Sequence, residues 1–374
     1  MSKNEQREKL YKEHLDEIFG LKPLDDFTQE DVDRCLERLI RCIPNDGKLY
    51  KYRSVEDTQF SYAFDALSKG YLWMASADTL NDDLEATLQY DPEKSLKELR
   101  DYVYSHPVEF VKFIFELSNT NIGYDYNDYQ VYEIVMQCID RESGEINVDI
   151  AAGTLVEKCH IAFEKAVDYI NQVNLFVSDM LARNEHLAKT FAESHLRLNE
   201  NMRKMSYIYS MSELFDLDNM WSLYANNNKG FCIEYDYHKV KNLDFETQRR
   251  LINTVRVIYS AKSDYSFVPT VKIAFNKHID DDESLQANRT TLLQLITKSK
   301  SWEAEKEWRI FLCNLDNDNK LFADIVSAII IDERVVKTEN AQKLIDLCKQ
   351  KGWSIKIRKK NSVGTKHEYV ELKD

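Results

Sequence analysis

The sequence predicts an α+β fold, with small mixed, mostly antiparallel sheets and a large helical insertion. Short stretches in which apolar and polar residues alternate, as they do in half-buried strands, are mixed with stretches of helical spacing. The two kinds do not follow one another in a regular strand–helix–strand order, which argues against a parallel α/β sheet. Only nine glycines and five prolines occur in 374 residues, which indicates few tight turns and much helix.

Composition indicates a soluble cytoplasmic protein. The chain is 43% hydrophobic and 30% charged, and it is long enough for about two domains. No apolar run approaches the ~18 residues of a membrane span, and the charged N-terminus lacks a signal-peptide core. The seven cysteines form no C-x-x-C pair, as expected for reduced thiols. A net charge of −14 argues against broad nonspecific binding to nucleic acid.

The chain is expected to have three parts. Residues 1–45 have the spacing of two short helices, separated near "GLKPLDD". Residues 46–93 and 206–374 carry the strand patterns and form the sheet-bearing, catalytic module. Residues 94–205 are dominated by helical spacing and form an inserted helical subdomain, which offers a surface for a protein partner.

Within the sheet-bearing module, strands and helices are expected in a definite order. The expected strands cover 48–54, 71–76, 206–212, 230–236, 254–260, 325–332, 353–360 and 367–372. The expected helices cover 57–70, 219–226, 284–299 and 340–352. The basic strand "SIKIRKK" reads either as a solvated edge strand or as part of a nucleic-acid groove.

An acidic stretch, "SWEAEKEWRIFL" (301–312), calls for an explanation. Trp308, Ile310 and Leu312 alternate like one face of a half-buried strand, and the other face would carry Glu303, Glu305, Glu307 and Arg309. Like charges two residues apart on a strand lie about 7 Å apart and repel. The same stretch can also end a helix, in which Glu303 and Glu307 share a solvated face with Lys306.

Several kinds of site are absent from the sequence. There is no G-x-x-x-x-G-K-[ST] loop, no G-x-G-x-x-G fingerprint and no G-x-S-x-G elbow. The eight histidines are scattered, with no H-E-x-x-H motif. No metal site is predicted.

Four segments carry a resemblance to a known family: "LYKYRS", "YSMSE", "MWSLYANNNKGFCIEYD" and "WEAEKEWRIFL". Together with the "LWMAS…ND" that follows the first helix of the module, they resemble the bacterial domain-of-unknown-function family 2971. The resemblance covers about 48–90 and 206–360 and leaves out the helical insertion. It implies no reaction.

The same order of segments is similar, more weakly, to the ADP-ribosyltransferase superfamily of the Arg-Ser-Glu type. Arg53 stands where those enzymes have their first-strand arginine, Ser210-Met211-Ser212 where they have S-T-S, and Glu305-Lys306-Glu307 where they have E-x-E. Met211 in place of threonine and the long helical insertion are departures from the pattern.

This second resemblance implies an ADP-ribosyltransferase-like core and NAD as substrate. Glu307 would stabilise the oxocarbenium-like transition state, and Glu305 would act on the acceptor. Arg53 would hold a phosphate or ribose. Ser210 would hydrogen-bond the nicotinamide ribose or fix Glu307. Ser212 and Tyr224 would also bind the cofactor, Tyr224 by stacking on a base or on nicotinamide.

Each of these residues also has an ordinary interpretation. Arg53 could pair with an acid such as Glu85, and the two serines could be plain strand residues. The aromatic side chains could all belong to the core, namely Trp221, Tyr224, Trp302 and Trp308.

The sequence thus predicts an ADP-ribosyltransferase-like enzyme that modifies an unidentified protein or nucleic-acid acceptor or hydrolyses NAD, with a toxin or phage-defence effector as the implied role. One alternative is a non-enzymatic module that binds a nucleotide or a partner. Another is a nucleic-acid-processing protein that uses its carboxylates with Mg²⁺.

Overall fold

The structure is a computed structural model that describes part of the chain. The described residues are 2–80 except 21 and 23; 131, 134–135, 137–138, 140 and 146–171; 193 and 196–197; 200–260; and 296–372 except 314, 316–318 and 361–365.

The chain divides into two compact units. The first comprises Met1–Thr87, Glu200–Ser263 and Leu292–Asp374, and the second comprises Leu88–Asn199 and Asp264–Thr291. The second unit therefore takes in Asp264–Thr291, which the sequence analysis assigned to the sheet-bearing module.

The first unit begins with two capped helices, as the sequence predicted. α1 (Lys3–Ile18) and α2 (Gln29–Cys42) each start with a capping box, in which Ser2 and Thr28 accept a hydrogen bond from the third residue of the helix. The 3-10 turn η1 (Leu24–Asp26) lies between them, and α3 (Pro44–Gly47) leads into the sheet. α2 buries one apolar face, on which Val32, Leu36 and Leu39 are fully enclosed.

A single nine-stranded sheet organises the first unit, where the sequence predicted several small sheets. Eight strands follow the order β13-β12-β11-β5-β1-β4-β9-β6, and β3 pairs with β4. Their bounds are β1 Lys48–Ser54, β3 Ala75–Ser76, β4 Ser206–Ser212, β5 Gly230–Asp236, β6 Thr254–Arg256, β9 Glu307–Cys313, β11 Val326–Asp332, β12 Ser354–Lys360 and β13 His367–Glu371.

Two expected strands are each divided between sheets. The 71–76 strand becomes β2 (Tyr71–Trp73), which pairs with β10 (Lys320–Phe322), and β3, which joins the large sheet. The 254–260 strand becomes β6 and β7 (Ile258–Ser260), which pairs with the parallel strand β8 (Thr297–Ser299). β8 also replaces the end of the helix predicted over 284–299; residues 284–295 of that helix lie outside the described part.

The sheet is antiparallel except for one pair. β11 and β12 are parallel and are joined by α15 (Glu339–Lys351), as a crossover connection requires. β13 covers the outer side of β12, so the basic strand "SIKIRKK" is an interior strand. The prediction that it forms a solvated edge was wrong, and Arg358 on it is fully buried.

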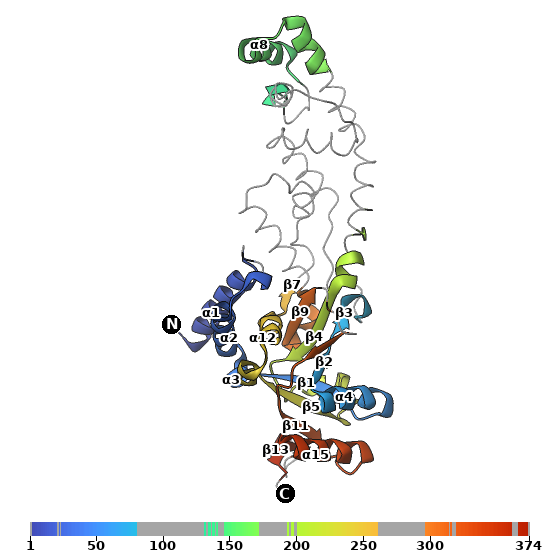
Figure 1. Ribbon diagram of the computed structural model, residues 1–374. Helices are drawn as coiled ribbons and strands as arrows, with labels where there is room; N and C mark the ends of the chain where they lie inside the picture. The colour runs from blue at the N-terminus through green and yellow to red at the C-terminus, as the bar shows by residue number, and fades with distance from the viewer. Residues whose placement is uncertain are drawn as a thin grey trace. The chain divides into compact units, whose positions relative to one another are not determined.

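Helices cover the sheet on both sides of β1. α4 (Asp57–Lys69) ends at Gly70 with φ 71°, a conformation that glycine adopts freely, and it contacts β1 and α15 (Figure 1). Leu49, Phe231 and Ile329 belong to the larger core. α11 (Asp218–Leu223) packs Trp221 on Tyr52 in a smaller cluster. Further helices that the structure describes in this unit are η2 (Ala77–Thr79), η3 (Tyr237–Asn242), α12 (Phe245–Leu251) and η6 (Lys300–Glu305).

The second unit contributes α8 (Val148–Cys159), which buries Ala151, Ala152 and Leu155 and exposes Ile150. Among the residues that the structure describes, no helix has the length and apolarity needed to cross a membrane.

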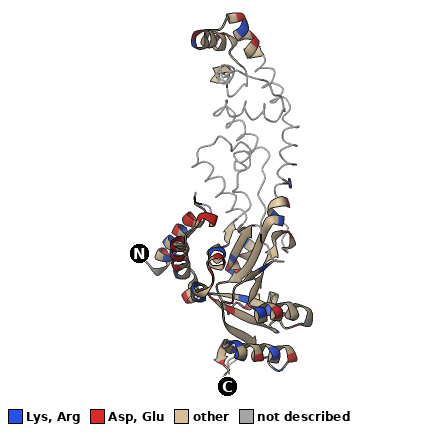
Figure 2. Cartoon of the chain, in the orientation of Figure 1, with Lys and Arg blue, Asp and Glu red and all other residues tan. Residues whose placement is uncertain are grey.

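Charged residues are unevenly distributed over the first unit. The helices carry most of the red and blue segments, with acidic residues prominent near the N-terminus, whereas the strands are mostly tan (Figure 2). A few charged side chains on strands are nevertheless buried, among them Glu234, Glu307, Arg309 and Arg358. A buried charge is costly unless a partner of opposite charge or a hydrogen bond compensates it.

Candidate functional site

The sequence-predicted site residues line one cavity of about 280 Å³ in the first unit. Arg53 comes from β1, Ser210 and Ser212 from β4, Tyr224 from the end of α11, Glu305 from η6 and Glu307 from β9. The rest of the lining is Tyr50, Lys51, Tyr52, Trp73, Ala75, Leu80, Ile208, Tyr209, Met211, Met220, Lys298 and Trp302. Strands β1, β4 and β9 are neighbours in the sheet, which is why residues about 250 positions apart in the chain meet here.

The sequence predicted that Glu305 and Glu307 share one face of a strand. In the structure they do not. η6 ends at Glu305 and β9 starts at Glu307, with Lys306 between them in a left-handed conformation at φ 49°. Only Glu307 belongs to the strand, and Glu303 is exposed on the 3-10 turn. The solvated-face alternative is also wrong for the other two carboxylates, because Glu305 and Glu307 are each 4% exposed.

One lysine holds both carboxylates. Lys298 Nζ lies 2.7 Å from Glu305 Oε2 and 3.0 Å from Glu307 Oε2. The Tyr224 hydroxyl donates to Glu305 Oε1 at 2.6 Å. Although burial lowers the pKa of Lys298, the charges of Glu307 and Glu305 outweigh it and raise that pKa above its usual value.

Arg309 is the second cation of this cluster. Its Nε and Nη2 donate to the two carboxylate oxygens of Glu307, at 2.7 and 3.1 Å. The Arg309 side chain is fully buried, and burial lowers its pKa to about 9, so it stays charged at neutral pH. Burial likewise raises the pKa of Glu307, against the opposing effects of Lys298 and the Ser210 hydroxyl.

The two serines have different surroundings. Ser210 lines the cavity with Glu307, and its hydroxyl lowers the pKa of the Glu307 carboxyl. Ser212 Oγ donates to the backbone carbonyl of Glu305 at 2.8 Å and is 1% exposed. Ser212 therefore secures the turn that carries Glu305, and it matches the ordinary interpretation of a strand-end serine better than a ligand contact.

Arg53 is half-buried, and its charge opposes the burial that raises the pKa of Tyr209. Among the described residues it forms no ion pair. The acid suggested as its partner, Glu85, lies outside the described residues.

The aromatic candidates separate into two groups. Trp221 and Trp308 are core side chains, 0% and 2% exposed. Tyr224 and Trp302 line the cavity, with Lys298 Nζ 5.0 Å from the centroid of the Trp302 ring.

Sequence reasoning missed three residues of the site, of which Lys51 and Lys298 line the cavity and Arg309 bonds Glu307. Lys298 was placed at the end of a helix, and Arg309 was noted only as part of the acidic stretch. Lys51 stands two residues before Arg53 in "KLYKYRS", and that spacing, which puts two cations on one strand face, was the available signal.

No group of three or more His, Cys, Asp or Glu side chains in the described part of the chain is arranged to hold a metal ion. The carboxylates of this cavity are bonded to Lys298 and Arg309 instead.

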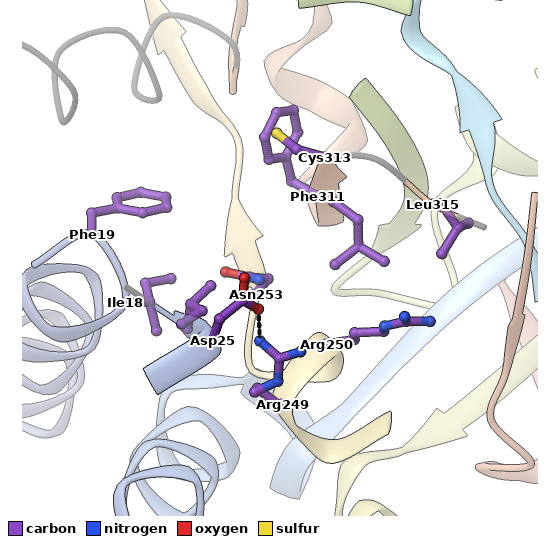
Figure 3. Close-up of a pocket in the computed structure, with 11 residues that line it drawn as sticks. Ile18, Phe19, Asp25, Arg249, Arg250, Asn253, Phe311, Cys313 and Leu315 are labelled. Carbon is purple, nitrogen blue, oxygen red and sulfur yellow. Dashed lines mark hydrogen bonds and ion pairs between the residues drawn. The ribbon is translucent and has the colours of Figure 1, made fainter. Parts of the chain in front are cut away.

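A second cavity, of about 390 Å³, lies at the other end of β9. Figure 3 shows its lining, with Ile18 and Phe19 from α1 and Phe311 and Cys313 from β9. Of the two arginines that line it, Arg249 is ion-paired with Asp25 and Glu246. No residue predicted from the sequence as functional lines this cavity.

Comparisons with known proteins identify one similarity. Residues 220–310 match the model of a family described as "Protein of unknown function (DUF2971)". This match lies within the later of the two ranges over which that resemblance was expected. It includes Tyr224, Lys298, Glu305 and Glu307, whereas Arg53 and Ser210 lie outside it. No curated protein and no solved structure matches the chain, and no comparison supports a resemblance to ADP-ribosyltransferases.

Proposed function

We propose that the cavity bounded by β1, β4 and β9 binds NAD and that the protein cleaves the nicotinamide–ribose bond. The observation that carries the proposal is that Arg53, Ser210, Glu305 and Glu307, chosen on sequence order alone, line the same cavity. At about 280 Å³ the cavity lies near the lower limit of small-molecule sites. It would therefore enclose one end of NAD, with the remainder of the dinucleotide outside.

In the proposed reaction the bond between ribose C1′ and the nicotinamide nitrogen breaks, and its electron pair leaves with neutral nicotinamide. The oxocarbenium-like transition state carries positive charge, which the Glu307 carboxylate would stabilise. A new C1′–O bond then forms to water or to the hydroxyl of a macromolecular acceptor, whose proton passes to Glu305. Ser210 would keep Glu307 oriented, and Arg53 would hold a phosphate or ribose of the substrate.

A second candidate is a nucleotide-binding module without catalysis, and a specific observation favours it. Lys298 and Arg309 already compensate the charge of Glu307. A carboxylate bonded to two cations stabilises a third positive charge less than a free one does. Catalysis would therefore require Lys298 to move away from Glu307 when substrate enters.

The carboxylate and Mg²⁺ alternative is less well supported, because the two carboxylates of the cavity are engaged by cations. A role as toxin or phage-defence effector, the identity of the acceptor and a protein partner for the 94–205 helices remain predictions from sequence.

The test is an assay of nicotinamide release and of NAD binding by calorimetry, with the purified chain. Glu307→Gln should reduce turnover ~10²–10³-fold and leave NAD binding nearly unchanged, because the carboxylate acts mainly in the transition state. Arg53→Ala should weaken NAD binding instead.

The matched control for Glu307→Gln is Glu234→Gln. Glu234 is also a strand glutamate 4% exposed and ion-paired to lysines, Lys48 and Lys356, but it does not line the cavity. The Glu234→Gln variant should have the same turnover as wild type. If wild type binds NAD without releasing nicotinamide, the binding module replaces the enzyme; if it neither binds nor consumes NAD, both candidates fail.

A further inference from the structure

Two cationic side chains on β1 face the cavity, and neither is paired with a carboxylate in the part of the chain that the structure describes. Lys51 and Arg53 are two residues apart on one strand, so their side chains are on the same face, and both line the cavity. Lys51 Nζ donates to the backbone carbonyl of Ser210 at 2.5 Å and lies 4.3 Å from the centroid of the Tyr209 ring. Arg53 contacts the Tyr209 side chain as well.

Among the described side chains that line the cavity, cations outnumber carboxylates. Its two carboxylates, Glu305 and Glu307, are bonded to Lys298 and Arg309, so these four groups cancel. Neither Lys51 nor Arg53 forms an ion pair with any residue that the structure describes. Lys51 and Arg53 are therefore cavity cations without a described carboxylate partner, in a chain whose net charge is −14.

Keeping these two cations together has a cost in the absence of a ligand. Groups two residues apart on a strand lie about 7 Å from each other and repel when they carry like charges. Burial and the charge of Arg53 both hold the pKa of Lys51 well below its usual value; Arg309 acts in the same direction, and Glu307 and Glu305 act against it. A doubly charged anion bridging the two side chains would remove the repulsion.

We propose that Lys51 and Arg53 together bind the diphosphate group of a nucleotide, with Lys51 as a binding residue in its own right. The inference deepens the proposed function, because it states which part of the substrate the β1 end of the cavity recognises. A guanidinium offers a planar fork of donors to one phosphate, and an ammonium offers a point charge to the next. Lys51 would then exchange its contact with the Ser210 carbonyl for a phosphate oxygen.

The experiment uses calorimetry with the full chain and three probes: ADP, inorganic pyrophosphate and adenosine. ADP and pyrophosphate should bind and compete with each other, and adenosine should bind at least ~10-fold more weakly. Each charged hydrogen bond lost should cost ~10–100-fold in affinity, so Lys51→Gln and Arg53→Gln should both weaken ADP binding on that scale. Lys51→Arg keeps the charge and should restore most of the affinity.

Lys239→Gln is the matched control. Lys239 Nζ also donates to a backbone carbonyl, that of Val326, at 2.5 Å, but Lys239 does not line the cavity. This variant should bind ADP like wild type. If Lys51→Gln does not fold, wild type alone still gives a test: ADP binding should weaken with added salt and should take up protons, measured in two buffers of different ionisation heat.

The outcomes separate this inference from the proposed reaction. Lys51-dependent binding of ADP and pyrophosphate without nicotinamide release upholds the inference and overturns the enzyme. Nicotinamide release with an unchanged KM for NAD in Lys51→Gln overturns the inference and upholds the enzyme. Absence of ADP and pyrophosphate binding by wild type, or binding of adenosine as tight as that of ADP, also overturns the inference.

Discussion

Two cavities of the first unit meet the two ends of the same strand, β9, and differ in how their charges are arranged. At the start of β9, Glu307 is almost completely buried and lies in a cluster of carboxylates and cations. At its end, Phe311 and Cys313 line a cavity whose Arg249 is paired with Asp25, a side chain that is 87% exposed.

The two arrangements differ in their free-energy cost: the buried cluster destabilises the fold unless its charges are well compensated, and the exposed pair does not. Buried ions lose hydration that their mutual attraction often fails to repay, whereas exposed pairs contribute about 0–1 kcal/mol. The buried cluster of Glu307, Lys298 and Arg309, with two further cations beside it, is therefore stronger evidence of a functional site. The pair of Arg249 and Asp25 at the second cavity is weaker evidence.

The largest effect is expected from Arg309→Met. This variant leaves the Glu307 carboxylate buried with Lys298 as its remaining charged partner, and the unfolding free energy should fall by about 3 kcal/mol. Urea unfolding followed by tryptophan fluorescence measures it, because all five tryptophans belong to the first unit. Arg249→Met at the second cavity is the control and should cost less than about 1 kcal/mol. Equal losses would remove the distinction between the cavities.

The free energy of unfolding should depend on pH through His14, which lies on the same helix as Ile18 of the second cavity. Its side chain is fully buried, and burial lowers its pKa from 6.5 to about 4. As pH falls from 6.5 toward 4, the unfolded chain takes up a proton that the folded chain does not, so stability is lost. The loss is about 1.4 kcal/mol per pH unit and about 3 kcal/mol over the window.

His14→Leu should remove this contribution and no other. The difference in unfolding free energy between pH 7 and pH 4.5 should therefore be smaller in the variant than in wild type. Identical pH dependence in the two proteins would contradict the buried neutral imidazole.

Glu305→Gln tests whether a carboxylate of the first cavity takes part in the reaction. If Glu305 accepts the proton of the acceptor, transfer of ADP-ribose should fall ~10²-fold, and hydrolysis by water should fall less. Labelled ADP-ribose transfer and nicotinamide release, measured in parallel, give the two rates. Glu303→Gln changes an exposed glutamate of the same 3-10 turn and should alter neither rate.

The smallest effect is expected from Asp25→Asn. The variant removes the exposed partner of Arg249, which keeps Glu246, so the unfolding free energy should change by no more than about 0.5 kcal/mol. Nicotinamide release should stay at the wild-type rate. A marked loss of release would show that the second cavity takes part in the function.

Local patterns were sufficient for the strands that carry the cavity. β1, β4 and β5 begin and end where the alternation of side chains predicted, because each is bordered by a change of pattern or a turn. Their order in the sheet was not predictable from such patterns, since pairing between β1 and β4 joins residues about 160 positions apart.

The missed residues were missed for the same reason. Lys298 belongs to a three-residue strand that exists because it pairs with β7, and its helical spacing gave the opposite expectation. In "SIKIRKK" the alternation correctly indicated a strand, but only pairing with β13 decides that Arg358 is enclosed. Contacts between distant segments override local preference at both places.

The left-handed backbone of Lys306 has a consequence for what a short acidic motif can mean. On an uninterrupted strand, the two glutamates of E-K-E would stand about 7 Å apart and would each require a cation. Here the chain changes direction at Lys306, and the two carboxylates converge on one ammonium group, 2.7 and 3.0 Å away. A single φ angle thus determines whether the same three residues form two independent charges or one shared site. The middle residue, whose own side chain is exposed, is the one that decides it.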